Sequence, residues 1–230
     1  LSGTPTAAKF NSMLEFWLSP DGSKFLLRGS TSQPTAESDS YLLLGSGSTG
    51  GVVLQEGRPF PGAIDAEVVD FFSGSVGYPF NANNDWAFSI RARGGASSTF
   101  NKIVRYQGMT GALRFQMGDL YTGLADNPEG SSGDETIGNS TAAIHLLNDG
   151  RIGWDDLATQ NISTTRRPVL AYDAVKYLQS RLDNVTTLDG SGPILLTNIG
   201  STGTLSVFLT SPDGTRTVVR GNVDTDGNGR

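Results

Sequence analysis

Four segments of the sequence share one pattern, in which an apolar run, a polar turn and a second apolar run follow one another. The turn residues best suited to a positive φ are Gly22, Asn84, Gly150 and Gly214, and successive ones are 62, 66 and 64 residues apart. Gly and Asn are the residues that tolerate the left-handed conformation of tight hairpin turns. The pattern therefore predicts four β-hairpins in a tandem repeat of about 64 residues.

Further apolar runs predict four strands in each complete repeat. The expected strands are Met13–Leu18, Lys24–Gly29, Tyr41–Leu44 and Gly51–Gln55, then Tyr78–Phe80, Ala87–Arg93, Lys102–Gln107 and Ala112–Met117, then Ile144–Leu147, Arg151–Leu157, Val169–Tyr172 and Tyr177–Val185. The fourth repeat holds only a first hairpin, within Leu205–Val223. We expect an all-β fold, a β-propeller-like array of four-stranded repeats, with a β-sandwich as the alternative. The repeats cover roughly 10–62, 63–124, 138–200 and part of 201–223 in one domain, 1–223, followed by a tail, 224–230.

Composition supports strands and excludes several classes of function. Gly (30), Ser (24) and Thr (22) make up a third of the chain, whereas Lys and Glu together number only 10. That profile disfavours helical bundles. The net charge is −6 and no basic cluster occurs, so we expect no nucleic-acid partner. There is no Cys, and no apolar run predicts membrane insertion. The chain starts at Leu1 rather than Met, which is typical of a processed or trimmed piece.

One segment resembles a known family. Residues Asn81 to Phe88, Asn-Ala-Asn-Asn-Asp-Trp-Ala-Phe, are similar to the signature of the secreted bacterial tandem-repeat proteins named for an Asn-x-x-Gly-x-x-Ala-Phe motif. Val52 to Gly62 also resembles the phrase between their repeats, although Asn84 stands where the family prefers Gly. The resemblance implies blade-like β repeats, export to the cell surface and a non-enzymatic role.

The C-terminal residues resemble the start of a calcium loop. Asp224, Asp226 and Asn228 supply oxygen ligands at alternate positions, and Gly229 follows. The segment is similar to the opening of a dockerin-type repeat, but the Glu at position 12 is absent. The expectation is an incomplete Ca²⁺ site, with a solvated tail as the alternative. No other cofactor is predicted.

Catalytic and sugar-binding residues are sparse. His145 is the only His, it lies in an apolar strand, and no Gly-x-Ser-x-Gly motif accompanies it, which favours a packed His. Carboxylates that could serve a glycosidase are Asp85, Asp149, Asp155, Asp156 and Glu135, although Asp in turns usually caps the backbone.

The ligand-binding candidates are Trp86 and Trp154, whose rings could stack on sugars. Both follow predicted hairpin turns at positions that look equivalent in the repeats, which favours the core instead.

Three functions remain open. The first hypothesis is a non-enzymatic, secreted, extracellular or cell-surface protein with a structural role, which self-associates through unpaired strand edges. The second is a propeller module that binds carbohydrate or protein. The third is a glycoside hydrolase or lyase, which needs two carboxylates roughly 5 to 9.5 Å apart.

Overall fold

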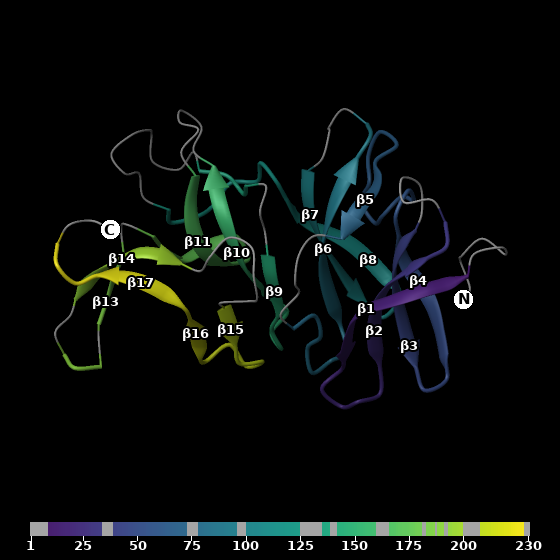
Figure 1. Cartoon of the computed structure of the whole chain (residues 1–230), viewed down its shortest axis with the longest axis horizontal. Coiled ribbons are helices and arrows are strands. Elements are labelled where there is room, and N and C mark those ends of the chain that lie inside the picture. The colour runs from purple at the N-terminus through teal and green to yellow at the C-terminus, as the bar shows by residue number, and fades with distance from the viewer. Residues whose placement is uncertain are drawn as a thin grey trace. The chain divides into compact units, whose positions relative to one another are not determined.

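The structure, a computed structural model, describes residues 9–33, 39–72, 78–95, 100–124, 135–138, 142–159, 166–180, 183–186, 188–190, 193–199 and 208–227. Every regular secondary-structure element in these ranges is a β-strand, so the all-β prediction is confirmed (Figure 1). No helix in the same ranges has the length and hydropathy to cross a membrane. The chain divides into two compact units, Leu1–Ser73 with Tyr78–Arg114, and Phe115–Arg230 with Gly74–Gly77.

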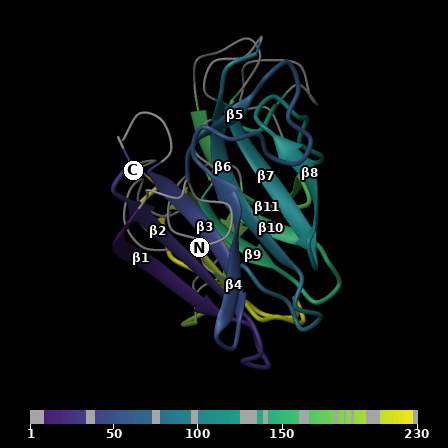
Figure 2. The ribbon, with the colours of Figure 1, turned by 90° about the vertical axis from the view of Figure 1, so that its right-hand side faces the viewer.

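The first unit begins with an antiparallel sheet, sheet 1, whose strands pair in chain order (Figure 2). They are β1 (Phe10–Leu18), β2 (Phe25–Thr31), β3 (Ser40–Ser46) and β4 (Thr49–Gln55). Each predicted strand of the first repeat matches one of these. Aromatic residues on β2 and β3 lie across glycines on the partner strand: Phe25 covers Gly45, and Tyr41 covers Gly29. Only glycine leaves room for the rings there.

The second sheet of this unit, sheet 2, contains β5 (Val68–Phe72), β6 (Trp86–Arg93), β7 (Phe100–Gln107) and β8 (Thr110–Gln116). Its first strand differs from the prediction. Tyr78–Phe80 forms only bridges, such as that of Phe80 with Trp86, and β5 pairs with β6 instead. Sheets 1 and 2 meet through Trp17 and Phe88, whose ring centroids are 5.5 Å apart.

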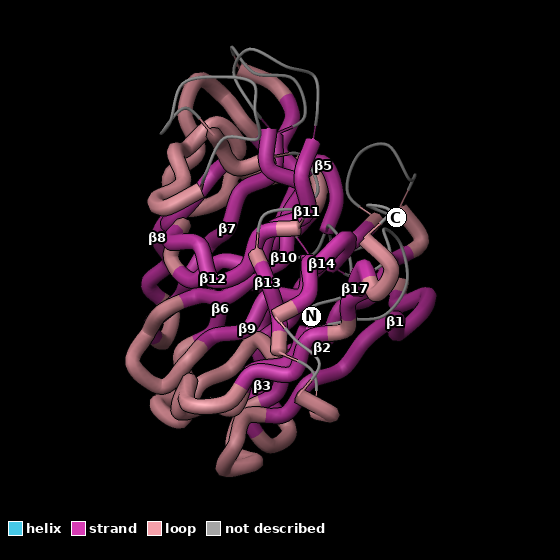
Figure 3. Tube along the Cα trace, turned by 90° about the vertical axis from the view of Figure 1, so that its left-hand side faces the viewer, coloured by secondary structure: helices cyan, strands magenta, loops and turns pink. Residues whose placement is uncertain are grey.

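The second unit contains sheet 3 and a three-stranded sheet (Figure 3), together with a separate hairpin that Figure 1 labels as β15 and β16. Sheet 3 comprises β9 (Ala142–Leu146), β10 (Ile152–Thr159), β11 (Arg166–Tyr172) and β12 (Val175–Gln179), again paired in chain order. The three-stranded sheet comprises β13 (Asn184–Val185), β14 (Ile194–Ile199) and β17 (Gly221–Asp224). The strands β15 (Phe208–Thr210) and β16 (Thr217–Val219) form hairpin 4, the predicted hairpin of the fourth repeat.

The four predicted turns are confirmed. Gly22, Asn84, Gly150 and Gly214 all have positive φ, at 69°, 58°, 89° and 71°. In each turn the N–H of this residue donates to the carbonyl oxygen three residues earlier. Three sheets are thus four-stranded and antiparallel, and none of the sheets in the described ranges closes on itself. This arrangement is compatible with propeller blades and equally with a sandwich.

The hydrogen bonds that close the turns correct one part of the repeat alignment. The first and fourth turns enclose four residues, whereas Asn81 N–H bonds directly to Asp85 O in the second, and Leu147 N–H to Arg151 O in the third. Counted from these closing pairs, Trp154 corresponds to Phe88. The predicted equivalence of Trp86 and Trp154 is therefore wrong by two residues, although both lie on the same face of their repeats because strand faces alternate with period two.

Candidate functional site

The two tryptophans considered as sugar platforms are core residues. The exposed fraction of Trp86 and of Trp154 is 0%. The ring of Trp86 stacks on Tyr106 with a centroid distance of 4.0 Å and an interplanar angle of 5°. Sugar stacking requires an exposed ring face, so neither side chain offers such a platform without opening the core.

Trp154 belongs to a buried hydrogen-bond network with Tyr121 and Asp156. Trp154 Nε1 donates to the Tyr121 hydroxyl oxygen at 2.8 Å. The Tyr121 hydroxyl donates to Asp156 Oδ2 at 2.8 Å, and the Gly138 N–H donates to the same oxygen at 2.7 Å. Burial, and then the negative charge of Asp156, raise the pKa of Tyr121 well above its usual value. The phenol therefore stays protonated and serves as a donor that holds the core together.

Asp155 lies next to this network on the opposite face of β10. It pairs in register with Leu170, which forms an apolar cluster with Leu147, Tyr172 and Leu196. Burial raises the pKa of Asp155 to about 6. Its Oδ1 is buried and receives no hydrogen bond from the described residues. Asp155 therefore has a strongly perturbed environment, yet Asp156 points to the other face and does not join it in one site.

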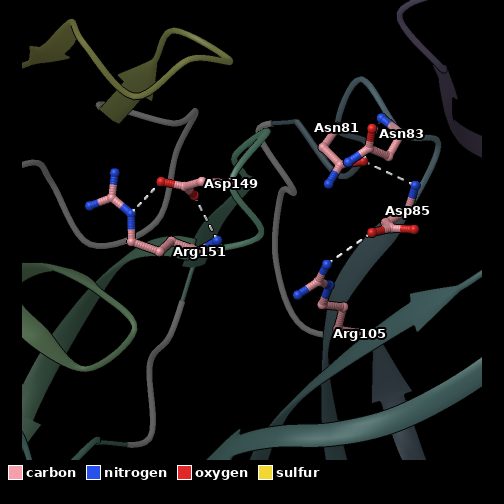
Figure 4. Close-up of polar contacts among 6 residues, drawn as sticks. All are labelled: Asn81, Asn83, Asp85, Arg105, Asp149 and Arg151. Carbon is pink, nitrogen blue, oxygen red and sulfur yellow. Dashed lines mark hydrogen bonds and ion pairs between the residues drawn. The ribbon is translucent and has the colours of Figure 1, made fainter.

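The carboxylates near two turns form ion pairs with arginines (Figure 4). Asp85 Oδ2 accepts from Arg105 Nη2 at 2.8 Å. Asp149 Oδ2 accepts from Arg151 Nε at 2.7 Å, and its Oδ1 caps the Arg151 N–H. Burial opposes ionisation of Asp149, but these hydrogen bonds lower its pKa overall. The prediction that turn aspartates cap the backbone is confirmed at Asp149. In the second turn Asn81 caps the backbone instead.

Sequence reasoning missed a pair of interacting carboxyl groups, Asp39 and Glu56. Glu56 is 8% exposed and follows β4, where it forms a parallel bridge with Val69 of β5. Burial, and then a hydrogen bond with Asp39, raise the pKa of Glu56 to about 7. Hydrogen-bonded carboxyls lie closer than the roughly 5 to 9.5 Å of glycosidase pairs. No local motif links the two residues, so only the pairing of the strands brings them together.

Further candidates from the sequence are His145 and the aspartates of the C-terminal tail. His145 is 1% exposed in β9, which confirms the packed His. In the tail, Asp224 Oδ1 accepts from the N–H groups of Asp226 and Gly227 at 3.2 and 2.7 Å. Asn228 lies outside the described residues. Within the described ranges no group of three or more His, Asp or Glu residues is placed to hold a metal. Calcium binding stays a prediction.

One feature that none of the candidates explains is an apolar surface on β1. The register of β1 with β2 places Phe10, Met13, Phe16 and Leu18 on the same face as Phe25 and Leu27; we call this the rear face of sheet 1. The exposed fractions of the four β1 side chains are 52%, 60%, 49% and 52%. Two β-bulges, at Asn11 and Leu14, keep these unevenly spaced residues on one face. The opposite face of β1 carries Trp17, which packs against sheet 2.

Comparison with known proteins adds no further assignment. No family model matches the chain, and neither a curated protein nor a solved structure matches it. The similarity of Asn81–Phe88 to the Asn-x-x-Gly-x-x-Ala-Phe signature therefore stays a prediction. Function has to be inferred from the residues of this chain, and their main feature is the apolar rear face of sheet 1.

Proposed function

We propose that the chain is a non-enzymatic, extracellular or cell-surface β-repeat protein that assembles by packing its sheets face to face in a propeller-like array. The observation that carries the proposal is the rear face of sheet 1, where four large apolar side chains of one strand are about half exposed. Soluble proteins rarely expose such contiguous apolar surface unless another molecule covers it. Sheet 1 is apolar on both faces, as expected of a sheet buried between two neighbours.

The expected strength of this contact is modest. Complete burial of a large apolar side chain stabilises by about 1.5–3 kcal/mol, so burying the exposed halves of four contributes roughly 3–6 kcal/mol. Association costs at least about 4 kcal/mol of lost translational and rotational freedom. The rear face alone therefore supports weak, concentration-dependent association. A stable assembly needs other surfaces as well.

The rival functions gain less support. A glycosidase or lyase requires two carboxylates free to act on a substrate. Asp85 and Asp149 are each paired with an arginine, and Asp155 and Asp156 lie on opposite faces of β10. A carbohydrate-binding module would need exposed aromatic rings, and both candidate tryptophans are buried. These observations favour assembly over catalysis or sugar binding.

The experiment is native mass against concentration, measured by sedimentation for the wild type and for Leu18→Thr. The mass should rise above 24.3 kDa with concentration in the wild type, and Leu18→Thr should shift this rise to higher concentration. Met109→Thr is the matched control, because Met109 is 72% exposed in the turn between β7 and β8. A wild-type chain that stays at 24.3 kDa at all concentrations contradicts the proposal.

A further inference from the structure

The first and fourth turns have the same sequence pattern and the same hydrogen bonds. Ser19-Pro20-Asp21-Gly22-Ser23-Lys24 matches Ser211-Pro212-Asp213-Gly214-Thr215-Arg216. In each, the Ser hydroxyl donates to the Asp Oδ1, at 2.7 and 2.6 Å. The N–H two residues after the Asp also donates to that oxygen, at 2.9 and 3.0 Å. The hairpin β1–β2 and hairpin 4 can therefore be compared residue by residue.

The two hairpins use opposite faces for packing inside the chain. In β1–β2, Trp17 faces sheet 2, the next sheet along the chain; we call this side the forward face. In hairpin 4, the equivalents of Leu18 and Phe25 on the rear face are Thr210 and Thr217. The hydroxyl of Tyr172 in sheet 3 lies 2.6 and 2.7 Å from their Oγ1 atoms.

Hydrogen bonds between neighbouring turns join the same pairs of repeats, the first with the second and the third with the fourth. Asn84 of the second turn donates through Nδ2 to Asp21 Oδ2 at 2.9 Å. In the second unit, the Asn148 N–H of the third turn donates to Pro212 O at 2.8 Å.

Counted from the closing pairs, Phe88 of sheet 2 corresponds to Leu27 on the rear face, and Gly153, which pairs with Tyr172 in sheet 3, corresponds to Leu26 on the forward face. In both units, then, the forward face of one repeat packs against the rear face of the next. The β1–β2 hairpin has its forward face covered, and hairpin 4 its rear face.

The faces left over are both apolar. On the rear face of sheet 1, Phe16 and Leu18 are 49% and 52% exposed. On the forward face of hairpin 4, Leu209 and Val218, which correspond to Trp17 and Leu26, are 52% and 67% exposed. Asp213 Oδ2 accepts no hydrogen bond from the described residues, whereas the equivalent Asp21 Oδ2 accepts from Asn84.

We propose that the forward face of hairpin 4 in one copy of the chain packs against the rear face of sheet 1 in a second copy, head to tail. The proposal rests on the proposed function and names the surfaces through which assembly proceeds. The same forward-to-rear order already joins sheet 1 to sheet 2 and sheet 3 to hairpin 4.

The sizes of the side chains also match. The forward face of hairpin 4 presents Leu209 and Val218, which are smaller than Trp17 and Leu26, their equivalents in sheet 1. The facing surface carries Phe16 stacked on Phe25, with ring centroids 5.5 Å apart. Small side chains opposite this stacked aromatic pair leave room for the two faces to pack closely. Because two different surfaces meet, the contact is heterologous, and it generates either a closed ring of copies or a filament.

The chain contains no cysteine, which permits a direct test by cross-linking. Single variants Leu18→Cys and Val218→Cys are mixed and treated with a short bifunctional maleimide. The expected product is the mixed dimer, formed about tenfold faster than either homodimer because docking raises the local concentration of the paired thiols. The matched control mixes Leu18→Cys with Val175→Cys, whose native side chain is 50% exposed on β12. This mixture should cross-link only at the rate of random encounter.

Other outcomes overturn the inference in distinguishable ways. Fast Leu18→Cys homodimers would mean that two rear faces meet, so the proposed assembly would stand and the head-to-tail order would fail. A chain carrying both Leu18→Cys and Val218→Cys that links only within itself, independently of concentration, would show that one chain covers its own open faces. Equal rates in all mixtures, with a native mass of 24.3 kDa throughout, would refute both the order and the assembly.

Discussion

Replacing Asp155 with asparagine should stabilise the protein at neutral pH. The carboxyl lies beside Leu170 on β10, its Oδ1 receives no hydrogen bond from the described residues, and burial raises its pKa to about 6. At neutral pH the folded protein must therefore hold an unfavourable buried charge. Asparagine has nearly the same shape and carries no charge. Asp155→Asn removes the ionisation and leaves the packing against Leu170 in place.

The magnitude and the sign follow from the raised pKa. The pKa rises from 3.8 to about 6 on folding, and each unit corresponds to about 1.4 kcal/mol, so the ceiling is about 3 kcal/mol. The folded state binds the proton more tightly than the unfolded state. The contribution of Asp155 to the free energy of unfolding therefore falls as pH rises from about 4 to about 6 and is flat above that range. The buried amide offsets part of the gain, which leaves an expected 1–3 kcal/mol, roughly, at pH 7.5.

The assay is urea denaturation of wild type and variant between pH 4 and pH 8. Glu56 also has a raised pKa, so the quantity to read is the difference between the two proteins at each pH. Asp156→Ala is the contrasting control: it removes the acceptor of the Tyr121 hydroxyl and the Gly138 N–H and should destabilise by roughly 2–4 kcal/mol. The reasoning is refuted if Asp155→Asn is no more stable than wild type at pH 7.5 and shows the same pH slope.

Three further variants test other parts of the structure. Glu56→Gln should flatten the decline in stability from about pH 4.5 to 7 that its raised pKa implies, and an unchanged decline by urea denaturation would contradict the raised pKa of Glu56. Lys102→Met should destabilise by about 3–5 kcal/mol because it leaves Glu67, its buried partner at 3.1 Å, without a counter-charge; the double variant with Glu67→Leu should recover most of that loss in the same assay. Asn84→Ala should raise the pKa of Asp21, and NMR titration of the carboxyl that finds no rise would count against that contact.

The parts of the fold that depend on local sequence could be predicted. Hairpin turns are encoded by a few adjacent residues, and all four predicted turn residues have positive φ. Most strands also follow from apolar runs bounded by Gly, Asn or Asp. The tryptophans were expected in the core because both follow hairpin turns at positions that looked equivalent in the repeats. Both are fully buried, although the positions differ by two residues.

Features that depend on contacts between distant residues could not be predicted. Asp39 and Glu56 interact only because β3 and β4 pair and bring their ends together. The strand β5 was missed because the sequence offers a second apolar run, Tyr78–Phe80, directly before the turn. That run was predicted to pair with β6, but β5 is the strand that pairs there. The one-residue difference in turn length also changes the alignment after each turn, and only the closing hydrogen bonds reveal it.

The bulges of β1 favour one of two modes of assembly for this strand. The sequence predicted association through unpaired strand edges, that of the incomplete fourth repeat above all, and β1, at the end of its sheet, offers another edge. A bulge disrupts the regular ladder that a pairing strand needs, and edge strands use bulges to resist such pairing. The same two bulges, at Asn11 and Leu14, keep Phe10, Met13 and Phe16 on the rear face. A strand that is irregular along its edge but continuous across its apolar face is suited to packing against another sheet, and this favours contact between faces over contact between edges.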